Sequence, residues 1–421
     1  GLVSGSVQFI RKAPDFSEKS YNINASLTAG SNDRRDGSLE AEFGGKYGYV
    51  RSNISHNEAG DYKDGSGKRV HSHFNRDSQM LQLGITPTEN TTIAGTYERS
   101  RAKVAYADRM MDGSKFDRDA WNVRFTQRNL TPWFSELELR YGESEIDHVM
   151  DTYSLRTIRN PAGKQIKNAN NPKRNTDTGR LKATFDWDNL NLQTGVDYMD
   201  DVHVARMERG GDGYRHKPYM PNQSFKQWGV FTEAAWQQTD KQRWVAGLRH
   251  DRVKADYDSA DVTDPALKHQ KFNLNSGFLR WERDTDNGLK YYAGFAIAER
   301  APDYWERLRA KKKIIHPEQN RQIDAGIIWK RPNLHASVSV FGSDVKNFII
   351  LERQGTDLGV RNVKASRFGG EAEVKWTFAP NWEIGSSLAY THGKNRTDGK
   401  PLAQTPPLEW NNTLAFDNGK F

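Results

Sequence analysis

The 421-residue sequence predicts an all-β protein, a transmembrane antiparallel β-barrel. Two observations predict this fold. About eighteen short segments between Ser20 and Phe416 alternate apolar and polar residues, as expected where one strand face meets lipid and the other a wet lumen. The connections between these segments are alternately very short and long, which is typical of barrels with short periplasmic turns and long external loops.

Four segments show the alternation most clearly: 121–126, 136–141, 181–187 and 371–378. Period-two alternation predicts strands with two different faces. The second face of these segments is charged, which suits a wet lumen and equally suits the outer face of a soluble sandwich. The connections must therefore decide between these two folds.

The short connections carry residues typical of turns. They are expected at 46–48, 86–90, 129–132, 188–190, 238–241, 284–288, 331–333 and 379–381. Long connections alternate with them, at 59–75, 102–117, 146–178, 200–223, 255–269, 300–319, 347–363 and 395–407. Such loops are uncommon in compact domains unless they are functional. All of them fall at the same end of the predicted strands, which favours the barrel.

Composition excludes several other classes. No run of eighteen or more apolar residues is present, so no membrane-spanning helix is expected. Cysteine is absent, so this chain can hold neither a disulfide nor a thiolate site. The net charge is +8, but Lys and Arg are dispersed among 54 acidic residues, which argues against nucleic-acid binding. No nucleophile, phosphate-loop or zinc-protease motif occurs, so no enzyme is expected.

The two ends suggest a piece of a longer protein. The first residues lack the charged and apolar regions of a signal peptide, and the chain stops directly after a turn-like segment, 417–420. Residues 1–18 are expected to be the tail of a preceding domain with its linker. The barrel is expected over 19–421, without its last strands.

Five elements, in order along the chain, resemble TonB-dependent outer-membrane receptors. They are Ser4–Pro14, Glu299–Glu306, His316–Glu318 with Gln322, Asp324 and Gly326, Asn362-Val363 with Gly369–Glu373, and Pro406-Pro407 with Trp410-Asn411. The first resembles the last strand of that family's plug. The resemblance implies a parent barrel of about 22 strands closed by a plug, with the TonB box outside this chain. It also implies the outer membrane of a Gram-negative bacterium and an inner-membrane TonB complex as partner.

Within that family, the continuation Asp303–Glu306 is most similar to the copper receptors. In that subfamily a loop His-x-Met binds copper together with a Cys and a Met of the plug. The matching residues here are His148 and Met150. The resemblance therefore implies that copper is the transported ligand and that these two residues are its primary ligands in this chain.

The distribution of methionine points to the same ion. Of seven Met, only Met80 is expected within a strand, and the other six are expected in or beside long connections. Thioethers select Cu(I), and imidazole accepts either oxidation state. In an extended segment, residues i and i+2 point the same way, so His148 and Met150 can bind one ion. The secondary candidates are Met110, Met111, His203 and Met207. His71-Ser72-His73 is expected to be a bystander in an external loop.

Other interpretations remain open from the sequence. A ferric-siderophore receptor of the same family would hold its chelate with Tyr106, Tyr214 and Tyr219. A passive porin or adhesion barrel would lack the plug, and a soluble β-rich carbohydrate-binding enzyme would need no membrane. The basic run 309–313 suggests contact with lipopolysaccharide phosphates in the outer membrane. We expect a monomer.

Overall fold

The computed structural model describes residues 20–310, 313–354 and 357–419. The predicted plug tail at residues 1–18 lies outside them, as do residues 311 and 312 of the basic run. The described residues form nineteen strands in one sheet. No helix in this part of the chain is long and apolar enough to cross a membrane.

The elements follow one another along the chain with few interruptions. The strands are β1 (Tyr21–Gly30), β2 (Arg34–Gly45), β3 (Gly48–Ala59), β4 (Phe74–Thr88), β5 (Thr91–Val104), β6 (Asp112–Arg128), β7 (Phe134–Asp151), β8 (Asn168–Trp187), β9 (Leu190–Arg209), β10 (Met220–Thr239), β11 (Gln242–Tyr257), β12 (His269–Asp284), β13 (Leu289–Arg300), β14 (Glu318–Arg331), β15 (Leu334–Gln354), β16 (Asp357–Ala379), β17 (Trp382–Asn395), β18 (Lys400–Pro401) and β19 (Glu409–Phe416). The helices are η1 (Gly213–His216), α1 (Pro265–Lys268) and α2 (Tyr304–Arg309).

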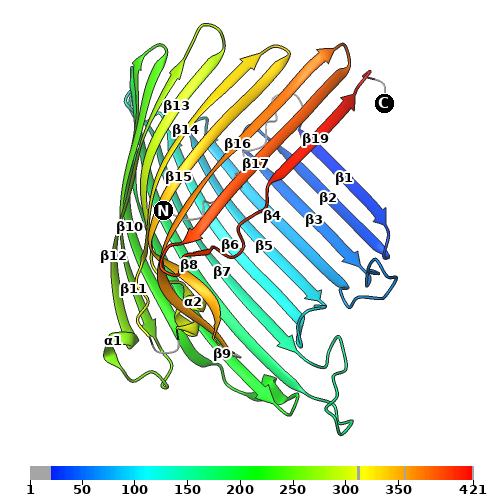
Figure 1. Cartoon of the computed structure of the whole chain (residues 1–421). Helices are drawn as coiled ribbons and strands as arrows, with labels where there is room; N and C mark the ends of the chain where they lie inside the picture. Colours follow the sequence, from blue (N-terminus) through cyan, green and yellow to red (C-terminus); the bar gives the residue numbers. More distant parts are fainter. Residues whose placement is uncertain (1–19, 311–312, 355–356, 420–421) are drawn as a thin grey trace.

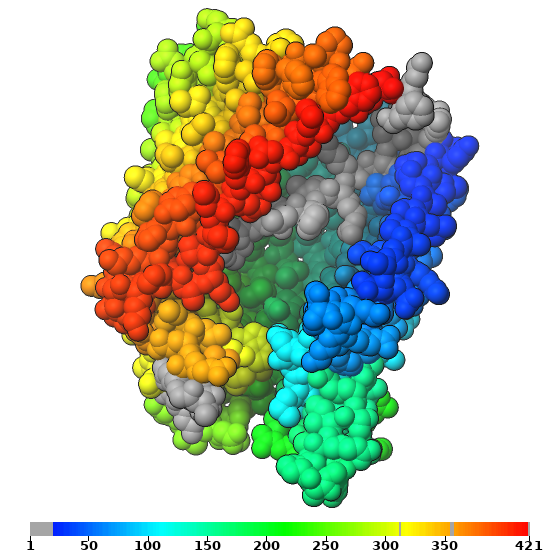
Figure 2. Space-filling model, turned by 45° about the vertical axis from the view of Figure 1, so that its right-hand side comes forward, coloured from blue at the N-terminus to red at the C-terminus, as the bar shows by residue number. Residues whose placement is uncertain are grey.

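Each strand pairs in antiparallel fashion with the next, and β17 pairs with both β18 and β19. The sheet curves into a tall wall whose two outermost strands, β1 and β19, face each other across an opening (Figure 1). Figure 2 shows the hollow that the wall surrounds, seen between the red and blue strands. The predicted all-β antiparallel architecture is confirmed.

The two faces of the sheet follow the predicted alternation. On β7, Leu139 and Tyr141 are exposed on the outside, whereas Glu138 and Arg140 line a pocket inside the wall together with Phe231 of β10. Because successive side chains of a strand point to opposite faces, even-numbered residues of β7 face inward.

Aromatic rings gather where the short turns lie. Trp133, Phe134, Phe185 and Trp187 form a stacked row beside the β6–β7 and β8–β9 turns, with centroid separations of 4.8 to 6.3 Å. Trp382 continues the pattern beside the β16–β17 turn, where its ring lies near Phe378 and Phe416. Such a band is typical of the boundary between a bilayer and water.

The predicted turns are confirmed, because each of the eight lies between two consecutive strands. The predicted loops 146–178 and 200–223 are too long. Strand β7 continues to Asp151 and β8 begins at Asn168, which leaves 152–167 as the loop, and the second loop shrinks to 210–219. A bilayer needs about 9–11 residues per strand, so these 18- to 20-residue strands extend well beyond it.

The predicted loop 347–363 is wrong. Strands β15 and β16 continue through this region, and their pairing resumes at Phe348 after an irregularity that follows Val345. Asn347 adopts a positive φ of 56°, which marks the bulge. A polar residue in a bulge interrupts the alternation without ending the strand, and this explains why the sequence suggested a loop there.

Candidate functional site

The primary candidates lie at the loop end of β7. His148 and Met150 had been expected in a loop, but both belong to the strand. The pairing of β7 with β8 keeps the same register on both sides of His148 and Val149, from Glu136 to Asp151. Since Glu138 faces the interior, His148 and Met150 face it as well, so the prediction that the two share a face is consistent with the structure.

Strand pairing aligns further methionines with this pair. Met150 lies opposite Asn170 of β8, and Asn170 lies opposite Met207 of β9. Neighbouring strands are about 4.8 Å apart, so the backbones of Met150 and Met207 are separated by about 10 Å. Met220, the first residue of β10, lies opposite Ala205, two residues before Met207.

These methionines are open to the interior. The side chains that line the inner pocket from β9 are odd-numbered, among them Asp201 and His203, so Met207 shares their face. Met207 is 53% exposed and Met220 is 61% exposed. Strands β7, β9 and β10 thus present thioethers along one rim.

The imidazole of His148 packs against a neighbouring ring but keeps one of its nitrogens without a partner among the described residues. Its ring is stacked on Phe116 of β6, with centroids 4.1 Å apart. Among the residues that the structure describes, its buried Nε2 has no hydrogen-bond partner. The main-chain carbonyl of His148 accepts a hydrogen bond of 3.0 Å from Asn171 Nδ2. The backbone is therefore fixed while one ring nitrogen is left for a ligand.

Met110 and Met111 lie in the 105–111 loop, directly before β6. Met110 is exposed, and Met111 comes two residues before Gly113, which pairs with Met150. The backbone thus brings this pair to the edge of the same site.

His203 has partners of its own. Its Nε2 lies 2.9 Å from Asp201 Oδ2, and its ring is stacked on Tyr304 of α2 with centroids 4.0 Å apart. The His203 imidazole is therefore engaged by the wall and by α2, four residues before Met207 on β9.

The tyrosines proposed for a chelate are largely occupied. Tyr214 is buried against Val149 and Ala169, and Val149 alternates with His148, so this cluster lies on the opposite face of β7. The guanidinium of Arg206 lies over the ring of Tyr219, 4.3 Å from its centroid.

The inner wall below the rim carries paired charges. Arg180 and Arg249 both bind Asp197, each at 2.6 Å, and Arg174 binds Asp201 at 2.6 Å. These pairs confirm that the charged strand face lines the hollow.

A polar connection between loops was missed by the sequence analysis. Asp112, at the start of β6, is fully buried and accepts a 2.7 Å hydrogen bond from Arg156 Nε of the 152–167 loop. Arg156 also donates to the carbonyl oxygens of Tyr106 and Arg109, and its ion pair with Asp112 raises the pKa of the guanidinium. The two partners are 44 residues apart, so no local pattern could have indicated the contact.

Comparison with known proteins agrees with this architecture. A family model described as the TonB-dependent receptor-like β-barrel matches residues 53–421. Among solved structures, the chain is similar to the copper transporter OprC, with 34% identity and a TM-score of 0.92, over 97% of this chain and 66% of that one. A comparison with curated proteins finds no match.

Two further structures have much lower sequence identity. The FrpB iron transporter from Neisseria meningitidis (F3-3 variant) has 14% identity and a TM-score of 0.72, over 95% of this chain and 67% of that one. The alcaligin receptor FauA from Bordetella pertussis has 15% identity and a TM-score of 0.66, over 96% and 66%. These two likenesses show the fold alone. With the family model matching most of the chain, the conclusion is that this protein belongs to the TonB-dependent receptor-like β-barrel family.

Proposed function

We propose that this chain forms the barrel of a TonB-dependent receptor that takes up copper across the outer membrane of a Gram-negative bacterium. One observation carries the proposal. His148, whose buried Nε2 has no hydrogen-bond partner among the described residues, and Met150 share the inner face of one strand at the rim. The 34% identity to a structure named as a copper transporter supports the same ligand.

The chemistry of these residues suits copper. A thioether is a soft ligand that favours Cu(I), and an imidazole binds copper in either oxidation state. His148 and Met150 supply two ligands, and further ligands would come from the plug, which is not among the described residues. Met110, Met111, His203 and Met207 would act as secondary contacts that collect the ion at the rim.

Transport needs no covalent step in this proposal. The TonB complex of the inner membrane would act on the plug and release the ion into the hollow. The paired charges on the inner wall would offer the departing ion a polar path. The barrel would act as a monomer, with its outer face in lipid and lipopolysaccharide.

A ferric-chelate receptor is the second candidate, since FrpB and FauA share the fold. Two of the three tyrosines expected to hold a chelate argue against it, because Tyr214 is buried and Tyr219 already contacts Arg206, whereas Tyr106 is only partly buried. A chelate also needs no soft sulfur, whereas Met207 and Met220 stand exposed at the rim.

Copper stoichiometry tests the proposal. The full-length protein, purified in detergent, would be analysed for bound copper as wild type and as the double variant H148A/M150A. We expect about one copper per chain in the wild type and none in the variant, because two of its ligands are lost. The matched control H56A/M80L removes a His of β3 and a Met of β4, neither of which belongs to the proposed site, and should keep its copper. Absence of copper from the wild type would leave the chelate receptor as the better interpretation.

A further inference from the structure

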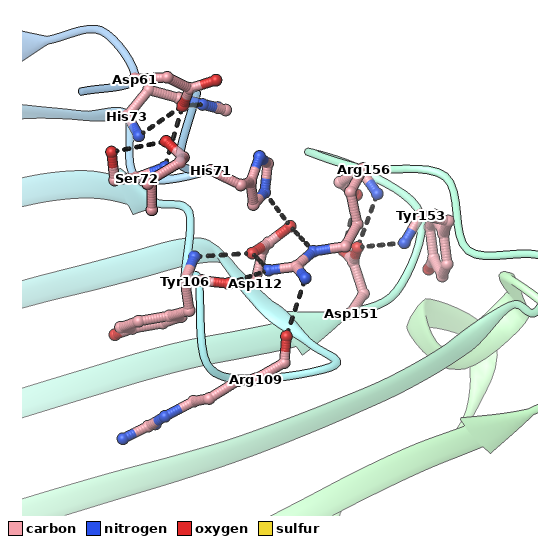
Figure 3. Close-up of polar contacts among 12 residues, drawn as sticks. Asp61, His71, Ser72, His73, Tyr106, Arg109, Asp112, Asp151, Tyr153 and Arg156 are labelled. Atoms are coloured by element: carbon pink, nitrogen blue, oxygen red, sulfur yellow. Dashed lines mark hydrogen bonds and ion pairs between the residues drawn. The ribbon is translucent and has the colours of Figure 1, made fainter. Parts of the chain in front are cut away.

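A second group of metal-ligand side chains lies in the 60–73 loop between β3 and β4. Asp61, His71 and His73 each bring one potential ligand atom within 4.8 Å of the others. Figure 3 shows Asp61 joined by polar contacts to Ser72 and His73, with His71 nearby and joined through Asp112 to Arg156. None of the three belongs to the copper site proposed above.

Asp61 is held through one of its two oxygens. Its Oδ1 accepts hydrogen bonds from the main-chain N–H groups of Ser72 and His73 at 2.9 and 3.0 Å, and lies 2.8 Å from His73 Nδ1. Burial raises the pKa of Asp61, but these bonds outweigh it and bring the pKa to about 2. Asp61 is therefore a carboxylate at neutral pH, and its Oδ2 lies 3.7 Å from Nε of the exposed Arg69.

His71 shows the arrangement that metal-binding histidines usually have. Its Nε2 lies 2.9 Å from Asp112 Oδ2, which leaves Nδ1 on the other side of the ring. Asp112 is itself fixed by Arg156 and by the main-chain N–H of Tyr106. A carboxylate that binds the second nitrogen of a ligating imidazole orients the ring and strengthens it as a ligand. His73 Nδ1 lies 2.8 Å from Asp61 Oδ1, so an ion bound by both atoms would take the place of the hydrogen that they share.

We propose that Asp61, His71 and His73 bind one divalent transition-metal ion of the zinc or copper(II) class. Two imidazoles and a carboxylate are the ligands that such ions prefer, and water would complete the shell. Ligand atoms around a tetrahedral zinc are about 3.3 Å apart, so small side-chain rotations would bring these atoms, which all lie within 4.8 Å of one another, to that spacing. His71 and His73 are 27% and 38% exposed, which gives the rings room to turn.

The position of this site links it to the rim. Asp112 is the first residue of β6 and directly precedes Gly113, the partner of Met150 in the sheet. A bound ion would tie the 60–73 loop, through His71 and Asp112, to the strand that supports Phe116 and His148. The inference does not depend on what the receptor transports.

Zinc is the suitable probe, because it needs no sulfur ligand. The full-length protein in detergent would be titrated with Zn²⁺ against a competing chelator. We expect H71A/H73A to bind one equivalent fewer than wild type, while H148A/M150A keeps that equivalent. D112N should weaken the same equivalent by about 10- to 100-fold, the usual effect of losing such a supporting carboxylate. Hydrogen exchange in the 60–73 loop should slow with zinc in wild type and not in H71A/H73A.

The matched control is H56A, which removes an imidazole that also lies 2.7 Å from a carboxylate, Asp77, but has no second imidazole beside it. It should bind zinc as wild type does. Equal zinc stoichiometry and affinity in wild type and H71A/H73A would overturn the proposal, as would loss of the equivalent in H148A/M150A. Titrating the same variants with Cu²⁺ and comparing its affinity with that of Zn²⁺ shows which of the two ions the site prefers.

Discussion

The imidazole ring of His148 lies nearly parallel to the phenyl ring of Phe116, with centroids 4.1 Å apart and 23° between the planes. The two residues sit opposite each other on β7 and β6. Phe116 in turn covers Gly113, where a Cβ atom would come within 1.9 Å of its ring. The orientation of the candidate ligand is thus set by the neighbouring strand, and this relationship can be tested without changing any ligand.

Gly113→Ala should weaken copper binding by displacing Phe116. The added methyl group has no room beside the ring, and overpacking of this kind costs about 1–3 kcal/mol. We expect copper affinity to fall several-fold while the stoichiometry is kept, measured by competition with a chelator. Gly95→Ala is the control, because no atom lies within 4 Å of its added Cβ. An unchanged affinity in Gly113→Ala would show that Phe116 does not position His148.

Met207→Leu combined with Met220→Leu should slow copper loading without removing the bound ion. Leucine keeps an apolar side chain of similar size but lacks the sulfur that attracts Cu(I). At limiting copper, we expect slower uptake into cells and an unchanged final stoichiometry. Met80→Leu, in β4, removes a buried sulfur away from the rim and should load as wild type does. Equal uptake rates in all three proteins would exclude a collecting role for the rim methionines.

Arg156→Met should loosen the loops that Asp112 joins. The change leaves a fully buried carboxylate without its cation, and breaking such a pair typically costs about 3 kcal/mol. Hydrogen exchange should accelerate in residues 105–111 and 152–167. Arg35→Met removes an exposed arginine that lies 3.8 Å from Glu58, and its effect should be much smaller. Equal hydrogen-exchange rates in the two variants would show that the contact between Arg156 and Asp112 does not hold these loops together.

Arg300→Met should release α2 from the wall. Arg300 donates to both carboxylate oxygens of Glu306 at 2.8 Å and also binds the buried Glu318 at 2.8 Å. Loss of the guanidinium leaves Glu318 uncompensated, so we expect a lower melting temperature and faster exchange in α2. Arg361→Met breaks a more open pair with Glu352 and should lower the melting temperature less. Equal melting temperatures for the two variants would contradict this role.

Much of the fold could be predicted because it is local. The alternation in 136–141 and the turn at 188–190 are properties of a few consecutive residues, and both were predicted correctly. The loop ends of β7 and β8 were not predicted correctly. Beyond the bilayer a strand needs only hydrogen-bonded neighbouring strands, and it no longer needs an apolar face. The loop predicted at 347–363 was wrong for a related reason, because a bulge such as the one at Asn347 resembles a loop in sequence.

What the sequence by itself determined is the pairing of His148 with Met150 on one face, because the period of a strand is two residues. Which distant residues join them was decided only by the tertiary structure. The alignment of Met150, Asn170 and Met207 depends on the register of three strands, which no local spacing encodes. The contact of His71 with Asp112 spans 41 residues and exists because a loop folds back onto the start of β6. The sequence determines which side chains can bind a metal, but strand pairing and loop packing determine the distances between them.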